Sequence, residues 1–113
     1  MSQYLILIYG PEEAYDTSAP AELAAMTESH RVFMADNQDA ILGGEALQRT
    51  STASTIRDGV VTDGAFAETK EALGGYYLIE APDLDAALAL AKQVPVFVGG
   101  GVEVRPIMVW NNG

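Results

Sequence analysis

The single histidine of this sequence, His30, is the side chain best suited to acid–base chemistry. An imidazole has an ordinary pKa close to neutrality, so it can act as a general acid or as a general base. A nearby carboxylate would fix its tautomer and raise its basicity, and Asp63 is the candidate for that role. We therefore take His30 and Asp63 as the predicted catalytic pair. The alternative is an interior histidine and an aspartate that only marks an Asp-Gly turn.

Other polar and aromatic side chains form a predicted substrate-binding set. Aromatic residues on strands are ordinarily core, an arginine on a strand can simply deter edge pairing, and charged loops are usually solvated, so each member also has a structural explanation. As ligands of a cleft, tyrosines would offer phenolic groups, an arginine could hold an anion, and a charged loop could contact a polar substrate. The predicted substrate-binding set consists of Tyr9, Arg57, Phe66, Glu68, Lys70 and Tyr76. Tyr77 is a further phenol that could line the cleft, but it is not a member of this set.

Composition excludes several classes of function. The chain has 113 residues, six Lys+Arg against sixteen Asp+Glu, and a net charge of −10, which disfavours nucleic acids and anionic membranes as partners. The apolar run at residues 4–9 is far short of the ~20 residues that span a bilayer, and it lacks the basic flank of a signal peptide. We expect a cytoplasmic protein.

Cofactor and metal sites are not indicated either. The chain has no cysteine and one histidine, so the usual zinc sets cannot form, and no acidic loop has calcium-binding spacing. The three glycines at 99–101 lead into a predicted strand rather than a helix. They therefore lack the helix N-terminus with which a glycine-rich loop binds phosphate. We predict no metal and no bound cofactor.

The elements that must position these residues follow from the pattern of apolar side chains. Residues 4–9 read as a buried central strand, and apolar residues at helical spacing predict a helix over 19–37, with His30 on its apolar stripe. Residues 41–47 read as a second strand that is bent or bulged at its glycines. Which residue caps the helix, Thr17, Ser18 or Ala19, stays open.

A β-hairpin at residues 54–62 is the clearest local signal. Asp58-Gly59 is typical of a two-residue type I′ turn, and this turn pairs Arg57 with Val60, Ile56 with Val61, and Thr55 with Thr62. We expect Ile56 and Val61 to face the core, and parity then directs Asp63 to the same side. A charged ordered loop is predicted over residues 63–73.

The last third of the chain predicts a strand at 76–80, a helix capped by Asp83, and a strand at 102–108 that Pro106 places at an edge or an end. The helix has the apolar stripe Leu84, Ala87, Leu88 and Ala91. Residues 1–113 thus form one domain of α+β class, a ferredoxin-like antiparallel sheet with both helices on one face. Apolar residues at both parities of several strands predict that a second copy covers the open face, as a homodimer.

The stretch from Val61 to Glu71, continued by Gly74-Gly75-Tyr76-Tyr77, resembles the signature of the YCII-related proteins, also known as the DGPF family. The resemblance spans nearly the whole chain. One departure is that the family's Asp-Gly-Pro-Phe reads Asp63-Gly64-Ala65-Phe66 here, which loosens the loop without removing a functional group. The other matching segments occur in the family's order: Tyr9-Gly10, His30, Gly43-Gly44, Asp58-Gly59 and Val102-Glu103-Val104-Arg105-Pro106.

This resemblance implies a dimeric ferredoxin-like fold, of the dimeric α+β barrel type, with a His–Asp pair in a cleft that carries over to His30 and Asp63. Members are mostly of unassigned function, and their genes often lie beside extracytoplasmic-function sigma factors. Related proteins include lyase-like enzymes acting on small cyclic compounds.

Three hypotheses follow. The first is a small cofactor-independent homodimeric enzyme, of isomerase or lyase type, that moves a proton on a small molecule by means of His30 and Asp63, with loop 63–75 partly closing the cleft. The second is a non-catalytic ligand-binding or regulatory module linked to a sigma factor. In the third, His30 and Asp63 only lock the helix to the sheet. A closed pocket with the two residues in hydrogen-bond contact favours the enzyme, and separated residues favour the module.

Overall fold

The computed structural model describes residues 1–66 and 71–110. Four long antiparallel strands form the main sheet, and two helices, α2 and α3, are its principal helical partners. A short helix, a 3-10 turn and a separate hairpin complete the described part. The elements are β1 (Ser2–Gly10), α1 (Glu13–Thr17), α2 (Pro20–Asp36), β2 (Ile41–Ala46), η1 (Thr50–Thr52), β3 (Ser54–Arg57), β4 (Val60–Asp63), β5 (Ala72–Ala81), α3 (Leu84–Ala91) and β6 (Gly101–Pro106).

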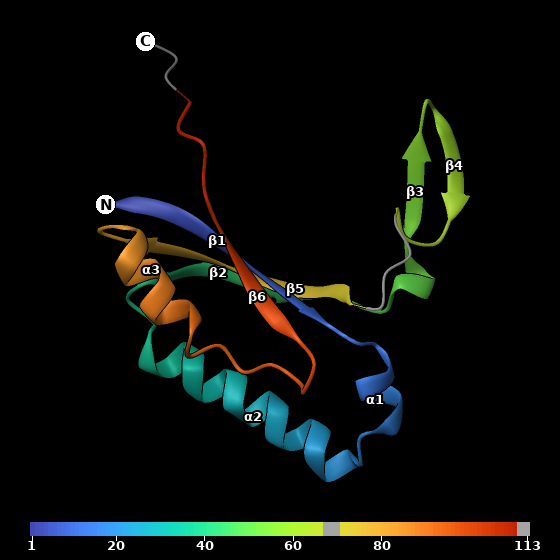
Figure 1. Ribbon diagram of the computed structural model, residues 1–113, viewed down its shortest axis with the longest axis horizontal. Helices are drawn as coiled ribbons and strands as arrows, with labels where there is room; N and C mark the ends of the chain where they lie inside the picture. The colour runs from blue at the N-terminus through green and yellow to red at the C-terminus, as the bar shows by residue number, and fades with distance from the viewer. Residues whose placement is uncertain (67–70, 111–113) are drawn as a thin grey trace.

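The main sheet has the strand order β2-β5-β1-β6, with every neighbouring pair antiparallel. Both α2 and α3 lie on one side of it (Figure 1). This order, with a helix after β1 and another after β5, is that of a ferredoxin-like α+β fold. The fold class predicted from the sequence is thus confirmed.

The core lies between the helices and one face of the sheet. Ile6 on β1 and Ile79 on β5 are completely buried there, and Phe33 of α2 packs with them. Because successive side chains of a strand point to opposite faces, Leu5 and Leu78, which pair across β1 and β5, lie on the other face. Among the described residues no helix covers that face, so it is the open face of the sheet.

The hairpin β3–β4 forms as predicted but does not join the core. Its register pairs Ile56 with Val61, and both turn residues have positive φ, +53° at Asp58 and +79° at Gly59, as a type I′ turn requires. The expectation that Ile56 and Val61 face the core is wrong, since they are 67% and 63% exposed. The hairpin is a separate two-stranded sheet that stands away from the main one (Figure 1).

The boundaries of α2 and α3 agree closely with the prediction from the sequence, whereas the buried face of α3 does not. Ala19 is the N-cap of α2, without a side-chain capping bond, and Asp83 caps α3 by accepting from the amide of Ala86 at 2.8 Å. The stripe predicted for α3 is partly wrong, because Leu84 and Leu88 are exposed. The buried face is set by where α3 crosses the sheet and consists of Ala87, Leu90 and Ala91.

Candidate functional site

A cavity of about 770 Å³ lies between α2 and the helix-bearing face of the sheet. Its volume falls in the range of ordinary small-molecule sites, about 300–1,000 Å³. Its walls are mostly apolar and come from α2, β1, β2, β5 and the segments around them. Leu23, Met26, Met34, Ile8, Leu47, Leu73, Val96 and Phe97 are among the apolar side chains that line it.

His30 and Tyr77 meet at the wall of this cavity, and their contact is its main polar feature. The helical stripe that includes Leu23, Met26 and Phe33 turns His30 toward the sheet. Tyr77 projects from β5 on the same face as Ile79, because the two lie two residues apart on one strand. The Nδ1 atom of His30 and the hydroxyl of Tyr77 are 2.7 Å apart, and the ring of Tyr77 packs against Phe33 with centroids 5.0 Å apart.

Burial adjusts the protonation of both groups in a consistent direction. Removal from water lowers the pKa of His30, and the backbone carbonyl of Pro95, as a hydrogen-bond acceptor, opposes this in part. Burial also raises the pKa of Tyr77. At neutral pH both groups are therefore uncharged. We assign the tautomer whose ring proton is directed to Pro95, in which Nδ1 accepts the hydrogen bond from the Tyr77 hydroxyl.

Residues in and beside α1 and η1 contribute to the cavity wall, and two polar contacts hold these two elements together. Glu12 accepts a hydrogen bond from the amide of Thr50 at 2.9 Å, and Asp16 pairs with Arg49 at 2.5 Å. The hydrogen bonds from Thr50 and Arg49 lower the pKa values of Glu12 and Asp16 respectively. Tyr15 of α1 contributes a further phenol to the lining. Neither α1 nor η1 is predicted from the sequence, because each is too short to show a periodic pattern.

The structure gathers only part of the predicted site. His30, Tyr9 and Tyr76 line the cavity, although strand alternation turns the side chain of Tyr76 to the opposite face from Tyr77. Arg57 and Phe66 lie instead at the hairpin, where the guanidinium carbon is 3.9 Å from the centroid of the phenyl ring. The remaining two predicted residues, Glu68 and Lys70, lie outside the described residues.

Asp63 is not brought to His30 within the chain. It is the last residue of β4, exposed, and pairs with Ser54 in the hairpin, whereas the Nδ1 atom of His30 bonds to Tyr77. The parity argument chose the correct strand face but assumed that the hairpin lay on the core. Whether Asp63 takes part in chemistry therefore stays a prediction.

Tyr77 is the partner of His30, and the sequence offered it as a phenol but not as a member of the predicted substrate-binding set. Whether Tyr76 or Tyr77 faces His30 depends on which face of β5 meets α2, and local sequence does not specify this. The paired glycines of β2 are a related signal in the sequence. A Cβ at Gly44 would lie 2.7 Å from Cδ1 of Tyr77 and 2.7 Å from the carbonyl of Tyr76, so glycine there makes room for the phenol ring.

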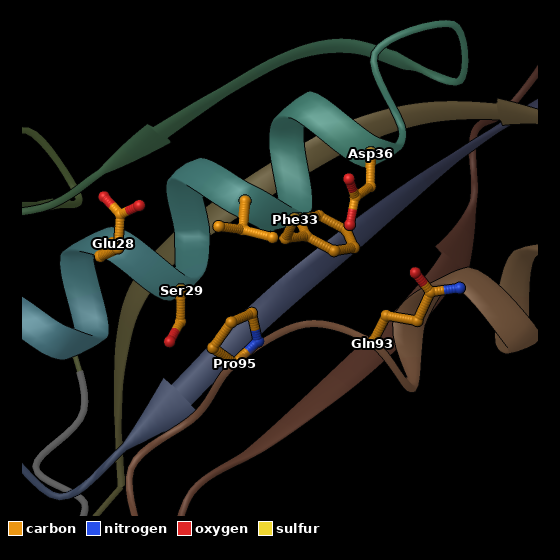
Figure 2. A pocket seen from close by; sticks show the side chains of 7 residues that line it. Glu28, Ser29, Phe33, Asp36, Gln93 and Pro95 are labelled. Carbon is orange, nitrogen blue, oxygen red and sulfur yellow. The ribbon is translucent and has the colours of Figure 1, made fainter.

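A second hollow lies on the other flank of α2 and is smaller and shallower, about 360 Å³. Figure 2 shows Ser29 of α2 pointing toward Pro95, and Asp36 of α2 and Gln93, which follows α3, further along the hollow, whereas the Glu28 carboxylate points away from Pro95. Glu28 is already paired with Arg31. The hollow offers no acid–base pair, so we take the cavity beside Tyr77 as the candidate site. Within residues 1–66 and 71–110, no three metal-binding side chains converge.

Comparison with known proteins gives one curated relative and one family model. One curated relative, an uncharacterized protein of Rhizobium meliloti (strain 1021), is 41% identical over 70 residues, which cover 57% of this chain and 56% of that protein. The matched region therefore spans little more than half the length of the relative. In the described part of the chain, no helix is long and apolar enough to cross a membrane. The family model of the YCII-related domain matches residues 2–111, and the chain thus belongs to the YCII-related family.

Proposed function

We propose that this protein binds a small, mostly apolar molecule in the cavity beside α2 and moves a proton on it through Tyr77 and His30. The observation that carries the proposal is the 2.7 Å contact between these two side chains at the wall of a cavity of about 770 Å³. A cavity of this kind, apolar with a few converging polar groups, is the usual form of a small-molecule site.

The proton path follows from the protonation states. The Tyr77 hydroxyl would accept a proton from a C–H or O–H group of the substrate while its own proton passes to Nδ1 of His30, which becomes an imidazolium. The reverse transfer would then return a proton to a different atom of the substrate. Such a sequence is an isomerisation, or an elimination where a group leaves before the proton returns. A single acid–base pair of this kind contributes about 10²–10⁴-fold to a rate.

The charges on the cavity wall favour an uncharged substrate. Glu12 and Glu45 lie on the walls, and the guanidinium of Arg49 is already paired with Asp16. An anionic substrate would meet these carboxylates in a chain that already carries a net charge of −10. Apolar ketones, lactones and phenols are therefore the compounds to test.

Deuterium exchange tests the proposal without knowledge of the natural reaction. Neutral cyclic ketones and lactones would first be screened for binding through the ¹H and ¹³C signals of His30, which is the only histidine of the chain. Bound compounds would then be incubated in D₂O, and loss of their acidic C–H signals would be followed by NMR. We expect the wild type to accelerate exchange and His30→Gln and Tyr77→Phe to lose at least about 10²-fold of it.

The matched control is Tyr4→Phe, which removes a phenol hydroxyl from β1 outside the cavity lining and should leave exchange unchanged. Equal exchange in Tyr77→Phe and the wild type would contradict the proton path. Failure of every compound to shift the His30 signals would contradict the site itself.

A binding module without turnover is the second candidate, and the separation of Asp63 from His30 favours it. A histidine without a carboxylate partner is a weaker base, and its bond to Tyr77 would then serve only to orient a ligand. Binding that shifts the His30 signals, with no acceleration of exchange, would select this alternative. The link to a sigma-factor partner belongs with it and rests on family resemblance alone.

We further propose that the protein is a homodimer joined through the open face of the sheet. Leu5, Leu7 and Leu78 lie on that face, away from both helices, and a second copy is the simplest cover for them. Sedimentation velocity of the wild type and of Leu7→Glu tests this. We expect a dimer that the charged variant dissociates.

A further inference from the structure

The β3–β4 hairpin and its flanking residues, 53–66, form an arm that projects from the main sheet. Its base is closed by a bond from the amide of Gly64 to the carbonyl of Ala53 at 2.7 Å and by one from Oγ1 of Thr55 to the carbonyl of Gly64 at 2.7 Å. Arg57 stacks on Phe66 beside it. The arm is therefore held in a defined shape by local contacts.

The arm exposes more apolar surface to water than is usual for a small hairpin. An isolated two-stranded hairpin is marginally stable at best, and it gains stability by packing an apolar face on another surface. The cross-strand pair Ile56 and Val61 provides such a face, and the two residues are 67% and 63% exposed. An exposed β-branched pair on one face of a small hairpin indicates a surface that is covered in the working protein.

The direction of the arm points to the surface that covers it. In Figure 1 the hairpin and the chain segment after β6 both rise on the side of the sheet opposite to α2. That segment, residues 107–110, carries the largely exposed Met108, Val109 and Trp110. Two exposed apolar projections thus stand on the side of the open face, where a second copy would dock.

The accessible surface of the chain is larger than that of a typical folded monomer, by an amount that a dimer interface could bury. It amounts to 8045 Å², whereas a folded monomer of 12.0 kDa exposes about 6,000 Å². The radius of gyration is 15.7 Å against about 13 Å for a folded chain of this length. The excess, about 2,000 Å² per chain, matches what each partner contributes to a large obligate interface.

We propose that the arm of each copy packs its Ile56–Val61 face onto the other copy, so that two arms clasp the dimer. The inference rests on the homodimer proposed above and adds the surface that holds it together. Two-fold symmetry places the same pair in the interface twice, and each substitution in the arm therefore weakens two contacts.

A conservative double variant tests the clasp. Ile56→Thr together with Val61→Thr keeps the β-branched side chains that suit a hairpin but removes much of the apolar surface. The control is Val98→Thr, because Val98 is 97% exposed in the turn before β6, outside the arm. We expect the dimer dissociation constant, from sedimentation equilibrium, to rise at least about 100-fold in the double variant and to stay unchanged in the control.

A deletion guards against an arm that merely unfolds. Because Ala53 and Gly64 are hydrogen-bonded across the base, residues 54–63 can be removed and the two ends joined without disturbing the main sheet. The His30 signals should then keep their positions while the dimer is lost. A dimer as tight as the wild type in both the double variant and the deletion would overturn the clasp and leave the open-face homodimer standing. A monomeric wild type would overturn both.

Discussion

The NMR signals and the titration of imidazole in this protein come from His30 alone, because the chain has one histidine. Burial lowers its pKa below about 6.5, the ordinary value, so between the two pKa values the unfolded chain binds a proton that the native chain does not. The contribution of His30 to the free energy of unfolding should therefore be constant well above about pH 6.5 and should fall as the pH drops through about 6.5 toward the native pKa.

The measurement is urea unfolding at several pH values between about 8 and about 5.5, at fixed protein concentration. Exposed carboxylates contribute their own pH dependence, so the readout is the difference between the wild type and His30→Gln. We expect the wild type to lose stability relative to the variant as the pH falls. Parallel curves would show that the pKa of His30 is not depressed.

The hydroxyl of Tyr77 supplies the second prediction at this scale. Tyr77→Phe removes the donor to Nδ1 of His30 and should lower the free energy of unfolding by about 1 kcal/mol. Tyr76→Phe is the control, since its side chain lies on the other face of β5, away from His30. The His30 ring signals should shift in the first variant only. A shift of equal size in both would contradict the assigned contact.

At the scale of elements, the two glycines of β2 differ sharply in what surrounds them. A Cβ at Gly44 would collide with Tyr77 and with the backbone of β5, whereas a Cβ at Gly43 would meet no heavy atom within 4 Å. Gly44→Ala should therefore displace the Tyr77 ring and cost about 1–3 kcal/mol.

Gly43→Ala, one residue away, should be close to neutral in stability and should leave the His30 signals in place. Urea unfolding and the NMR spectrum of His30 measure both effects. If the two variants behave alike, the tight contact between β2 and Tyr77 is not what positions the phenol.

The elements also explain what the sequence could predict. The hairpin register was predicted correctly because Asp58-Gly59 specifies its own turn, and the apolar stripe of α2 was correct because it is periodic. The partner of His30 was not predicted, since Tyr77 lies 47 residues away and the contact depends on how α2 crosses β5. Asp63 was directed to the core because parity specifies a face of the hairpin but not the sheet on which the hairpin packs.

For the whole molecule, net charge opposes the assembly proposed here. Each copy carries −10, so two copies repel each other, while the surfaces that would join them are apolar. At 0.1 M salt, the repulsion between exposed charges more than about 10 Å apart is largely screened. Raising sodium chloride from about 20 mM to about 300 mM should therefore lower the dimer dissociation constant several-fold. Sedimentation equilibrium measures it, and weaker dimers at high salt would indicate an interface built on ion pairs.

The two outer strands of the main sheet have a consequence for how the protein behaves when concentrated. A free strand edge is a template for aggregation into extended sheets. The β2 edge is interrupted by a register shift between Ile41 and Gly43, and the β6 edge carries Glu103 and Arg105 and ends at Pro106, which has no amide hydrogen to donate. Growth by strand addition is thus blocked on both sides. Fibril formation, with the dye response of cross-β structure, should be absent unless the main sheet first unfolds.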